Sequence, residues 1–325
     1  MAAPSAYPSC SGAEPLRRVR LRRAGVVAFF VFFLLVLPIG TVQAQGAHGT
    51  RFMDLSQAES DAVLARVRAL PLTERLDLLS TFFFGTPYGH DPLGEGERDE
   101  FDRDPEFRLD QVDCITFIET LLAMSRSKSL SETRALLPRI RYQGVPSYPT
   151  RRHIVWSQWL PGLVELGFLE DITAKIAPGA TSRQQLGVTD PSQCAPSWRD
   201  FCLRLGPHFP REQVEHDMVG VDWVLRNPDT IPSGSLMLIV LVERPGIPYR
   251  VTHLGLVLRD PKGRAVLRHA SKTTGLVVEQ PLLRYVAGLK RRYEKRPVAG
   301  LMFARIKDAE PSGKEFEKPV TVPHP

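Results

Sequence analysis

The sequence has little cysteine, no excess of one charge sign outside its first residues, and no apolar run long enough to span a bilayer. Only four of the 325 residues are cysteine, and 42 lysines and arginines face 36 acidic residues, a formal net charge of +6. Residues 1–44 hold five arginines and one acid, which leaves +2 on the remainder. A nearly neutral body offers no positive surface to a phosphate backbone, so we exclude a dedicated nucleic-acid binder.

The first 44 residues have the pattern of an export signal. The arginines precede an uncharged apolar run of 14 residues, 24–37, shorter than the ~20 residues of a membrane-spanning helix. Residues 42–44 (Val-Gln-Ala) match the small-x-small pattern of a cleavage site. We expect cleavage after Ala44, and an uncleaved anchor is the alternative. Either outcome places the body outside the cytoplasm. After cleavage we expect it to be periplasmic or secreted, with no stable membrane insertion.

Export makes the cysteine count informative. Cys10 leaves with the signal, so the mature chain has three cysteines. An odd number in an oxidising compartment leaves one thiol without an intramolecular partner. Cys194 and Cys202 are close in sequence and can form a disulfide, which makes Cys114 the odd thiol. A free cysteine in an exported protein favours nucleophilic use.

Apolar periodicity predicts helices first and strands later. The helices are expected from a capping box at Ser56 to before Pro71, then over 73–84, 114–124, 131–137 and, more loosely, 156–166, with a loop over 85–110. The strands are expected over 236–242, 251–258, 265–270, 275–279 and 300–306. This order indicates an α+β fold with an antiparallel sheet. We expect one catalytic domain over 45–306 with an insertion near 181–216, and a disordered tail over 307–325.

Cys114 is expected in the first turn of its helix, directly after Asp113, a typical N-cap residue. Backbone N–H groups and the helix dipole favour a thiolate at this position. The same N–H groups can stabilise an oxyanion on an attacked carbonyl. The alternative is a small buried apolar side chain, the usual state of a free cysteine.

His253 is the candidate base, and His269 is the candidate group that orients it. Residues 260–263 (Asp-Pro-Lys-Gly) predict a three-residue hairpin loop with a bulge, so that paired residue numbers sum to 524. In that register both imidazoles share one face as diagonal neighbours. A loop of two or four residues would send them to opposite faces. The alternatives are a half-exposed histidine without a catalytic role, or orientation by Asp113 or Glu119.

Three blocks resemble those of the NlpC/P60 cell-wall cysteine hydrolases. They are Asp-Cys-Ile-Thr-Phe at 113–117, Thr-His-Leu-Gly-Leu at 252–256 and Arg-His-Ala-Ser at 268–271. Thr-Pro-Tyr at 86–88 resembles the Pro-Tyr element of that superfamily. The cysteine block extended to Glu119, Ile-Arg-Tyr-Gln-Gly at 140–144 and Arg152-His153 resemble the DUF1460 branch, the N-acetylmuramoyl-L-alanine amidase-like proteins. The likeness covers about residues 85–306.

The resemblance implies a papain-like α+β fold, a Cys–His–His triad and muropeptides derived from peptidoglycan as substrates. It makes Cys114 the nucleophile, His253 the base and His269 the orienting group. Further residues implied to line the site are Tyr88, Asp113, Arg152 and His153. Typical NlpC/P60 proteins have Asp-Cys-Ser-Gly, whereas Thr116-Phe117 follow here, which fits the DUF1460 branch and argues against simple γ-D-glutamyl endopeptidase specificity.

The predicted function is that of an exported cysteine amidase. It would cut the bond between N-acetylmuramic acid and L-alanine in peptidoglycan fragments through a thioester intermediate. The alternatives are an endopeptidase that cuts within the stem peptide and a catalytically silent peptidoglycan-binding module. No cofactor is expected, because the eight histidines include no His-Glu-x-x-His zinc pattern. The basic run 290–292 is interpreted as a solvated turn.

Overall fold

The computed structural model describes residues 49–308. The predicted export signal lies outside the described residues, and so does the predicted tail apart from Lys307 and Asp308. Within the described range, helices come first and most strands later, which confirms the α+β class. None of the described helices is long and apolar enough to cross a membrane.

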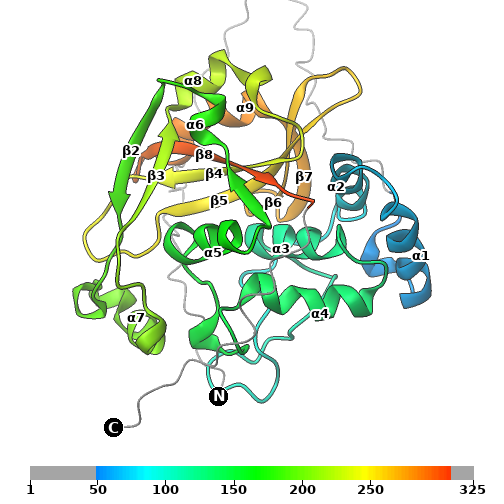
Figure 1. Ribbon diagram of the computed structural model, residues 1–325, viewed down its shortest axis with the longest axis horizontal. Coiled ribbons are helices and arrows are strands. Elements are labelled where there is room, and N and C mark those ends of the chain that lie inside the picture. Colours follow the sequence, from blue (N-terminus) through cyan, green and yellow to red (C-terminus); the bar gives the residue numbers. More distant parts are fainter. Residues whose placement is uncertain (1–48, 309–325) are drawn as a thin grey trace, which may run out of the picture. The chain divides into compact units, whose positions relative to one another are not determined.

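The first half of the described chain supplies the helical layer on one side of the sheet (Figure 1). The first helix begins at the predicted capping box, where the Ser56 N–H donates to the Glu59 carboxylate at 2.8 Å and the Glu59 N–H donates to the Ser56 hydroxyl. In the third helix every residue from Thr116 to Met124 is buried. The bounds are α1 Gln57–Val67, α2 Leu72–Thr81, α3 Cys114–Met124, α4 Leu130–Arg141 and α5 Leu160–Glu165, with a π-helical turn at Val155–Trp159.

The second half supplies most of an antiparallel sheet in the order β2-β3-β8-β4-β5-β6-β7, with β1 paired to β8 outside that path. Each of the five predicted strands is present. β4 is buried at every residue, because strands flank it on both edges and helices cover both faces. The bounds are β1 Leu169–Asp171, β2 Thr181–Leu186, β3 Val214–Val219, β4 Ser235–Leu241, β5 Val251–Arg259, β6 Ala265–Ser271, β7 Leu276–Pro281 and β8 Val298–Ile306.

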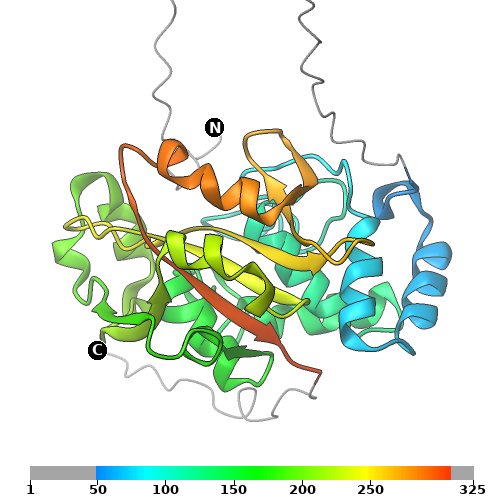
Figure 2. The ribbon, with the colours of Figure 1, turned by 90° about the horizontal axis from the view of Figure 1, so that it is seen from above.

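Alternation along the strands fills a separate apolar core on each face of the sheet. Leu254, Leu256 and Leu258 of β5 belong to the core shared with α1–α5, whereas Val257 and Leu267 belong to the core on the other face. Figures 1 and 2 show that second face covered by short helices. Burying each leucine contributes about 1.5–3 kcal/mol, so a slipped register would be costly. The covering helices are α6 Thr173–Ile176, α8 Val221–Arg226, α9 Leu282–Ala287 and α10 Leu289–Arg292.

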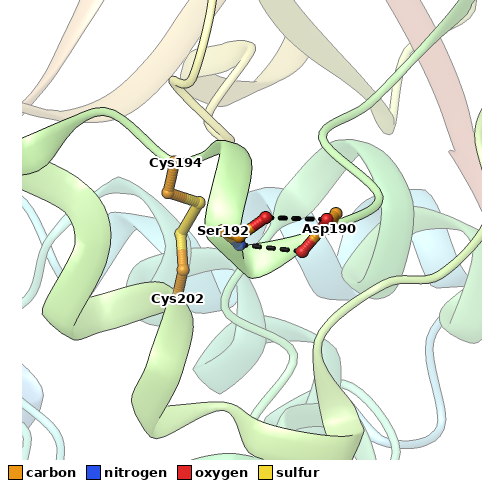
Figure 3. Close-up of a disulfide and its surroundings, with 4 residues drawn as sticks. All are labelled: Asp190, Ser192, Cys194 and Cys202. Carbon is orange, nitrogen blue, oxygen red and sulfur yellow. Dashed lines mark hydrogen bonds between the residues drawn. A yellow bond between two sulfur atoms is a disulfide. The ribbon is translucent and has the colours of Figure 1, made fainter.

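The segment 181–216 joins the sheet through β2 and the start of β3. The connection from β2 to β3 contains a disulfide. Cys194 is bonded to Cys202 of α7 (Arg199–Arg204), with Cα atoms 6.7 Å apart (Figure 3). Asp190 closes the preceding turn by accepting hydrogen bonds from the Ser192 N–H at 2.8 Å and the Ser192 hydroxyl at 2.7 Å. Both cysteines are buried in a small aromatic cluster of their own.

Candidate active site

The β5–β6 hairpin has the register that its loop sequence predicts. The Asp260 N–H donates to the Arg264 carbonyl at 2.9 Å, and Gly263 has the left-handed φ of 78° that the bulge requires. Leu256 pairs with Arg268, so paired residue numbers sum to 524 as expected. The predicted register is therefore confirmed.

The two strands separate beyond the Leu256–Arg268 pair. β6 continues beside β7 to Ser271, whereas the first half of β5 pairs with β4 alone. The separated end of β5 carries His253, and that of β6 carries His269. Helix α3 packs against both strands. This fork in the sheet is where the candidate site forms.

The two histidines lie in contact at the fork. His253 Nε2 is 2.8 Å from His269 Nδ1, and the rings meet edge to face with centroids 4.8 Å apart. Gly255 permits this approach, because a Cβ at that position would lie 2.9 Å from the His269 Cβ. Both imidazoles are buried. The sequence therefore places these side chains on one face correctly.

Cys114 begins α3 directly after its cap, as predicted. Asp113 Oδ1 accepts hydrogen bonds from the Ile115 N–H at 3.1 Å and the Thr116 N–H at 2.8 Å, and the Asp113 N–H donates to the Thr116 hydroxyl at 2.9 Å. The cap thus engages two of the N–H groups that were expected to hold an oxyanion. Asp113 itself is committed to the helix, and the Cys114 N–H remains as the helix donor nearest the thiol.

The Cys114 thiol is protonated in the free protein. Burial raises its pKa to about 12, and the Asp113 carboxylate adds to the rise. The N–H groups of Leu254, Cys114 and Ile115 lower the pKa, but desolvation outweighs them. The expectation of a thiolate at this helix N-terminus is therefore wrong for the resting site. The interaction with the Leu254 N–H also shows where the thiol lies. The thiol is beside β5, at the residue that directly follows His253.

Both histidines are neutral at rest. Burial lowers the pKa of His253 well below its usual value, with His269 and Arg292 adding to the shift. Burial, and then Arg292, lower the pKa of His269 to about 4. The resting site thus holds a thiol and a neutral base. Its chemistry requires the proton to move as the nucleophile attacks.

Three tyrosines near the thiol come from the loop after α2 and from the α9–α10 segment. Tyr285 of α9 lies 5.0 Å from the His269 ring and 6.2 Å from the His253 ring, measured between centroids. Burial raises the pKa of Tyr285, of Tyr293 and of Tyr88, and in each case interaction with Cys114 raises it further. All three phenols therefore lie within electrostatic range of the thiol and keep their protons. Of the three, the sequence indicates only Tyr88.

Gln280 of β7 is a second residue that the sequence does not indicate. Its Nε2 lies 3.4 Å from His269 Nε2, on the side of that ring away from His253. An amide can present either its oxygen or its nitrogen to an imidazole, and this choice sets the His269 tautomer. If the oxygen faces His269, His269 is protonated at Nε2, and its Nδ1 accepts a hydrogen bond from the His253 Nε2–H. His253 then keeps the lone pair on its own Nδ1 for the thiol.

Arg152 and His153 both have partners inside the fold, and their role in lining the site stays a prediction. The buried Arg152 guanidinium donates to three carbonyl groups around the C-terminal end of α4, two of them at 3.2 and 3.3 Å. His153 Nε2 lies 2.7 Å from the Tyr148 carbonyl, and burial lowers the pKa of this histidine well below its usual value. Glu119, the alternative orienting group, is similarly engaged with Arg141 at 2.6 Å.

A buried ionic network fixes the loop that carries Tyr88. Arg151 lies 2.5 Å from Glu95, 2.6 Å from Asp102 and 3.2 Å from Asp91. Asp91 has a φ of 49°, the one positive φ at a described residue other than glycine. Burial raises its pKa to about 7, although Arg151 opposes the rise.

In the described part of the chain, no group of three or more His, Cys, Asp or Glu side chains could hold a metal ion.

This α+β fold brings a capped cysteine, a paired histidine and protonated phenols to one fork, which is an arrangement suited to acyl transfer. The chain belongs to the AmiA-like family, described as N-acetylmuramoyl-L-alanine amidase-like, whose model matches residues 78–291. The resemblance to the amidase-like branch is thus confirmed, whereas membership of the wider NlpC/P60 superfamily stays a prediction. No curated protein matches the chain significantly.

Solved structures share this fold. A Legionella pneumophila protein described by the DUF1460 family model has a TM-score of 0.65 and 20% identity, over 77% of this chain and 94% of that one. An N-acetylmuramoyl-L-alanine amidase of Bacteroides uniformis has a TM-score of 0.55 and 22% identity, over 70% of this chain and 97% of that one. A second structure of a B. uniformis amidase has the same TM-score, 20% identity, and coverage of 77% and 99%. At these identities the likeness establishes the fold.

Proposed function

We propose that the protein is an exported cysteine amidase with an NlpC/P60-type, papain-like site. It hydrolyses the amide bond between N-acetylmuramic acid and L-alanine in peptidoglycan fragments. The observation that carries the proposal is the His253–His269 hydrogen bond of 2.8 Å at a fork whose Leu254 N–H faces the Cys114 thiol. Membership of the amidase-like family supports the choice of bond.

In the first half-reaction, His253 Nδ1 accepts the thiol proton as Sγ attacks the lactyl carbonyl carbon. The thiol pKa of about 12 means that attack and proton transfer occur together. The Cys114 N–H and the Tyr88 hydroxyl are donors for the oxyanion. Protonated His253 then gives its proton to the L-alanine nitrogen, the C–N bond breaks, and the peptide leaves the thioester behind.

In the second half-reaction, water replaces the peptide amine. His253 removes a proton from the water as its oxygen attacks the thioester carbonyl. The C–S bond breaks, Sγ regains its proton from His253, and the muramic acid carboxyl group is released and loses its remaining proton to solvent. His269 holds the His253 ring in one orientation and tautomer through both steps.

Export is part of the proposal and rests on the residues before Gln45. A disulfide between Cys194 and Cys202 suits an oxidising compartment and supports this location.

Mass spectrometry of products from a defined muropeptide mixture tests the function. Release of intact stem peptides with N-terminal L-alanine supports the proposal. Cleavage within the stem peptide supports the endopeptidase instead, and binding without any product supports the silent module. The Cys114→Ala variant, checked by circular dichroism for an unchanged fold, is the control for contaminating hydrolases.

A further inference from the structure

Arg292 places a positive charge beside the candidate site. It ends α10 and is exposed, and its guanidinium carbon lies 4.4 Å from the centroid of the Tyr285 ring. Among the described residues it has no carboxylate within ion-pair distance. Lys290 on the same short helix, by contrast, lies 3.7 Å from Asp222. The interpretation of 290–292 as only a solvated turn therefore omits what Arg292 faces.

Two observations connect this charge to the reaction centre. The Tyr285 ring, on which the guanidinium stacks, also contacts both imidazoles of the histidine pair. The field of Arg292 also contributes to the low pKa of His253 and of His269, so it acts directly on that pair. A cation so placed lies one aromatic ring away from the base.

We propose that Arg292 binds a carboxylate of the substrate, namely the α-carboxylate of the residue that follows L-alanine in the stem peptide. This inference rests on the proposed function, because that function puts a peptide on the leaving side of the scissile bond. An extended residue spans about 3.3–3.6 Å, so this carboxylate lies at most about 7 Å from the scissile nitrogen. An arginine fork matches a carboxylate with two parallel hydrogen bonds.

Two substrates that differ at this one group test the proposal. They are N-acetylmuramoyl-L-alanyl-D-glutamate and N-acetylmuramoyl-L-alanyl-D-isoglutamine, whose α-substituent is a carboxylate and a neutral amide respectively. We expect the wild-type protein to have about three- to tenfold higher kcat/KM for the carboxylate, mainly through KM. Arg292→Gln should bring the ratio close to one, and Arg292→Lys should keep part of it. Arg291→Gln, the matched control at the neighbouring exposed position, should keep the wild-type ratio.

The ratio separates this proposal from a purely electrostatic role. If Arg292→Gln slows both substrates equally and shifts the acidic limb of the pH profile, Arg292 acts on the histidines alone and the proposal is overturned. An unchanged ratio overturns it as well. If the wild-type protein hydrolyses neither compound, the proposed reaction fails. Calorimetric binding of both compounds to Cys114→Ala, with and without Arg292→Gln, then decides the inference: loss of a carboxylate preference supports it, and equal or absent binding contradicts it.

Discussion

The Nε2 atom of His253 and the Nδ1 atom of His269 lie 2.8 Å apart, so one nitrogen carries a proton and the other a lone pair. Because this bond occupies Nε2 of His253, only Nδ1 remains to accept a proton from the thiol. Both rings are neutral, and hydrogen bonds connect His253 to His269 and His269 to Gln280. The orientation of the Gln280 amide therefore determines which nitrogen of each ring carries the proton. The reactivity proposed for Cys114 depends on that arrangement.

Replacing His269 should remove the hydrogen bond that orients His253, the proposed base. His269→Ala should lower kcat by about 100-fold, because the His253 ring loses its fixed orientation and tautomer. His269→Asn or His269→Gln should retain part of the rate, since an amide can still hydrogen-bond to His253. Steady-state kinetics on a defined muropeptide measure this. Equal losses in the three variants, with unchanged melting temperatures, would show that His269 does not orient the base.

Gln280 should control the tautomer from one residue further away. Gln280→Glu presents only acceptor oxygens, so His269 must be protonated at Nε2 and the His253 Nδ1 lone pair is kept. This variant should retain kcat and move the acidic limb of the pH profile upward, because a carboxylate raises the pKa of the pair. Gln280→Met, similar in size but unable to donate or accept strongly, should lose about tenfold in kcat. The account is contradicted if Gln280→Met is more active than Gln280→Glu.

Alkylation of Cys114 in the free protein should be slow at neutral pH. A thiol pKa of about 12 means that the thiolate fraction, and with it the iodoacetamide rate, rises about tenfold per pH unit between pH 7 and 10. An ordinary thiol levels off near pH 9. Peptide mapping distinguishes Cys114 from the bonded Cys194 and Cys202. A rate already at its plateau at pH 7 would mean that the thiolate is present at rest.

Asp91 should make the protein less stable as the pH rises. Its pKa is about 7 in the folded protein and near 3.8 when unfolded. The free energy of unfolding therefore falls as the pH rises from the lower value to the higher one, because only the unfolded state ionises readily in that range. Asp91→Asn removes this cost and tolerates the φ of 49°. We expect a gain of about 1–2 kcal/mol at pH 8 and none below pH 4, from urea unfolding. A gain that is the same at both pH values points to some other cause.

The parts of the site fixed by short stretches of sequence are predictable from it. The loop at 260–263 determines the hairpin register by turn geometry alone, and Asp113 caps α3 through atoms within three residues. Both features depend on neighbours along the chain. Amphipathic periodicity likewise gives most helices and strands, because side-chain burial repeats with their geometry.

What depends on tertiary packing is not predictable in this way. The pKa of Cys114 follows from the desolvation of this partly buried thiol by the folded chain, and helix position alone gives the wrong direction. Arg152 matches a sequence block, yet its donors are taken by carbonyl groups that only the folded chain brings near. Tyr285 and Gln280 reach the histidines from elements later in the chain.

Trapping the acyl-enzyme tests the central claim most directly. Wild-type protein mixed with an N-acetylmuramoyl-peptide, quenched in acid within one turnover and digested, should yield the Cys114 peptide with the mass of a muramoyl group added. The free stem peptide should appear in the same sample. Cys114→Ala should give neither. Release of the stem peptide by Cys114→Ala at the wild-type rate, or a muramoyl adduct on another residue, would contradict the account.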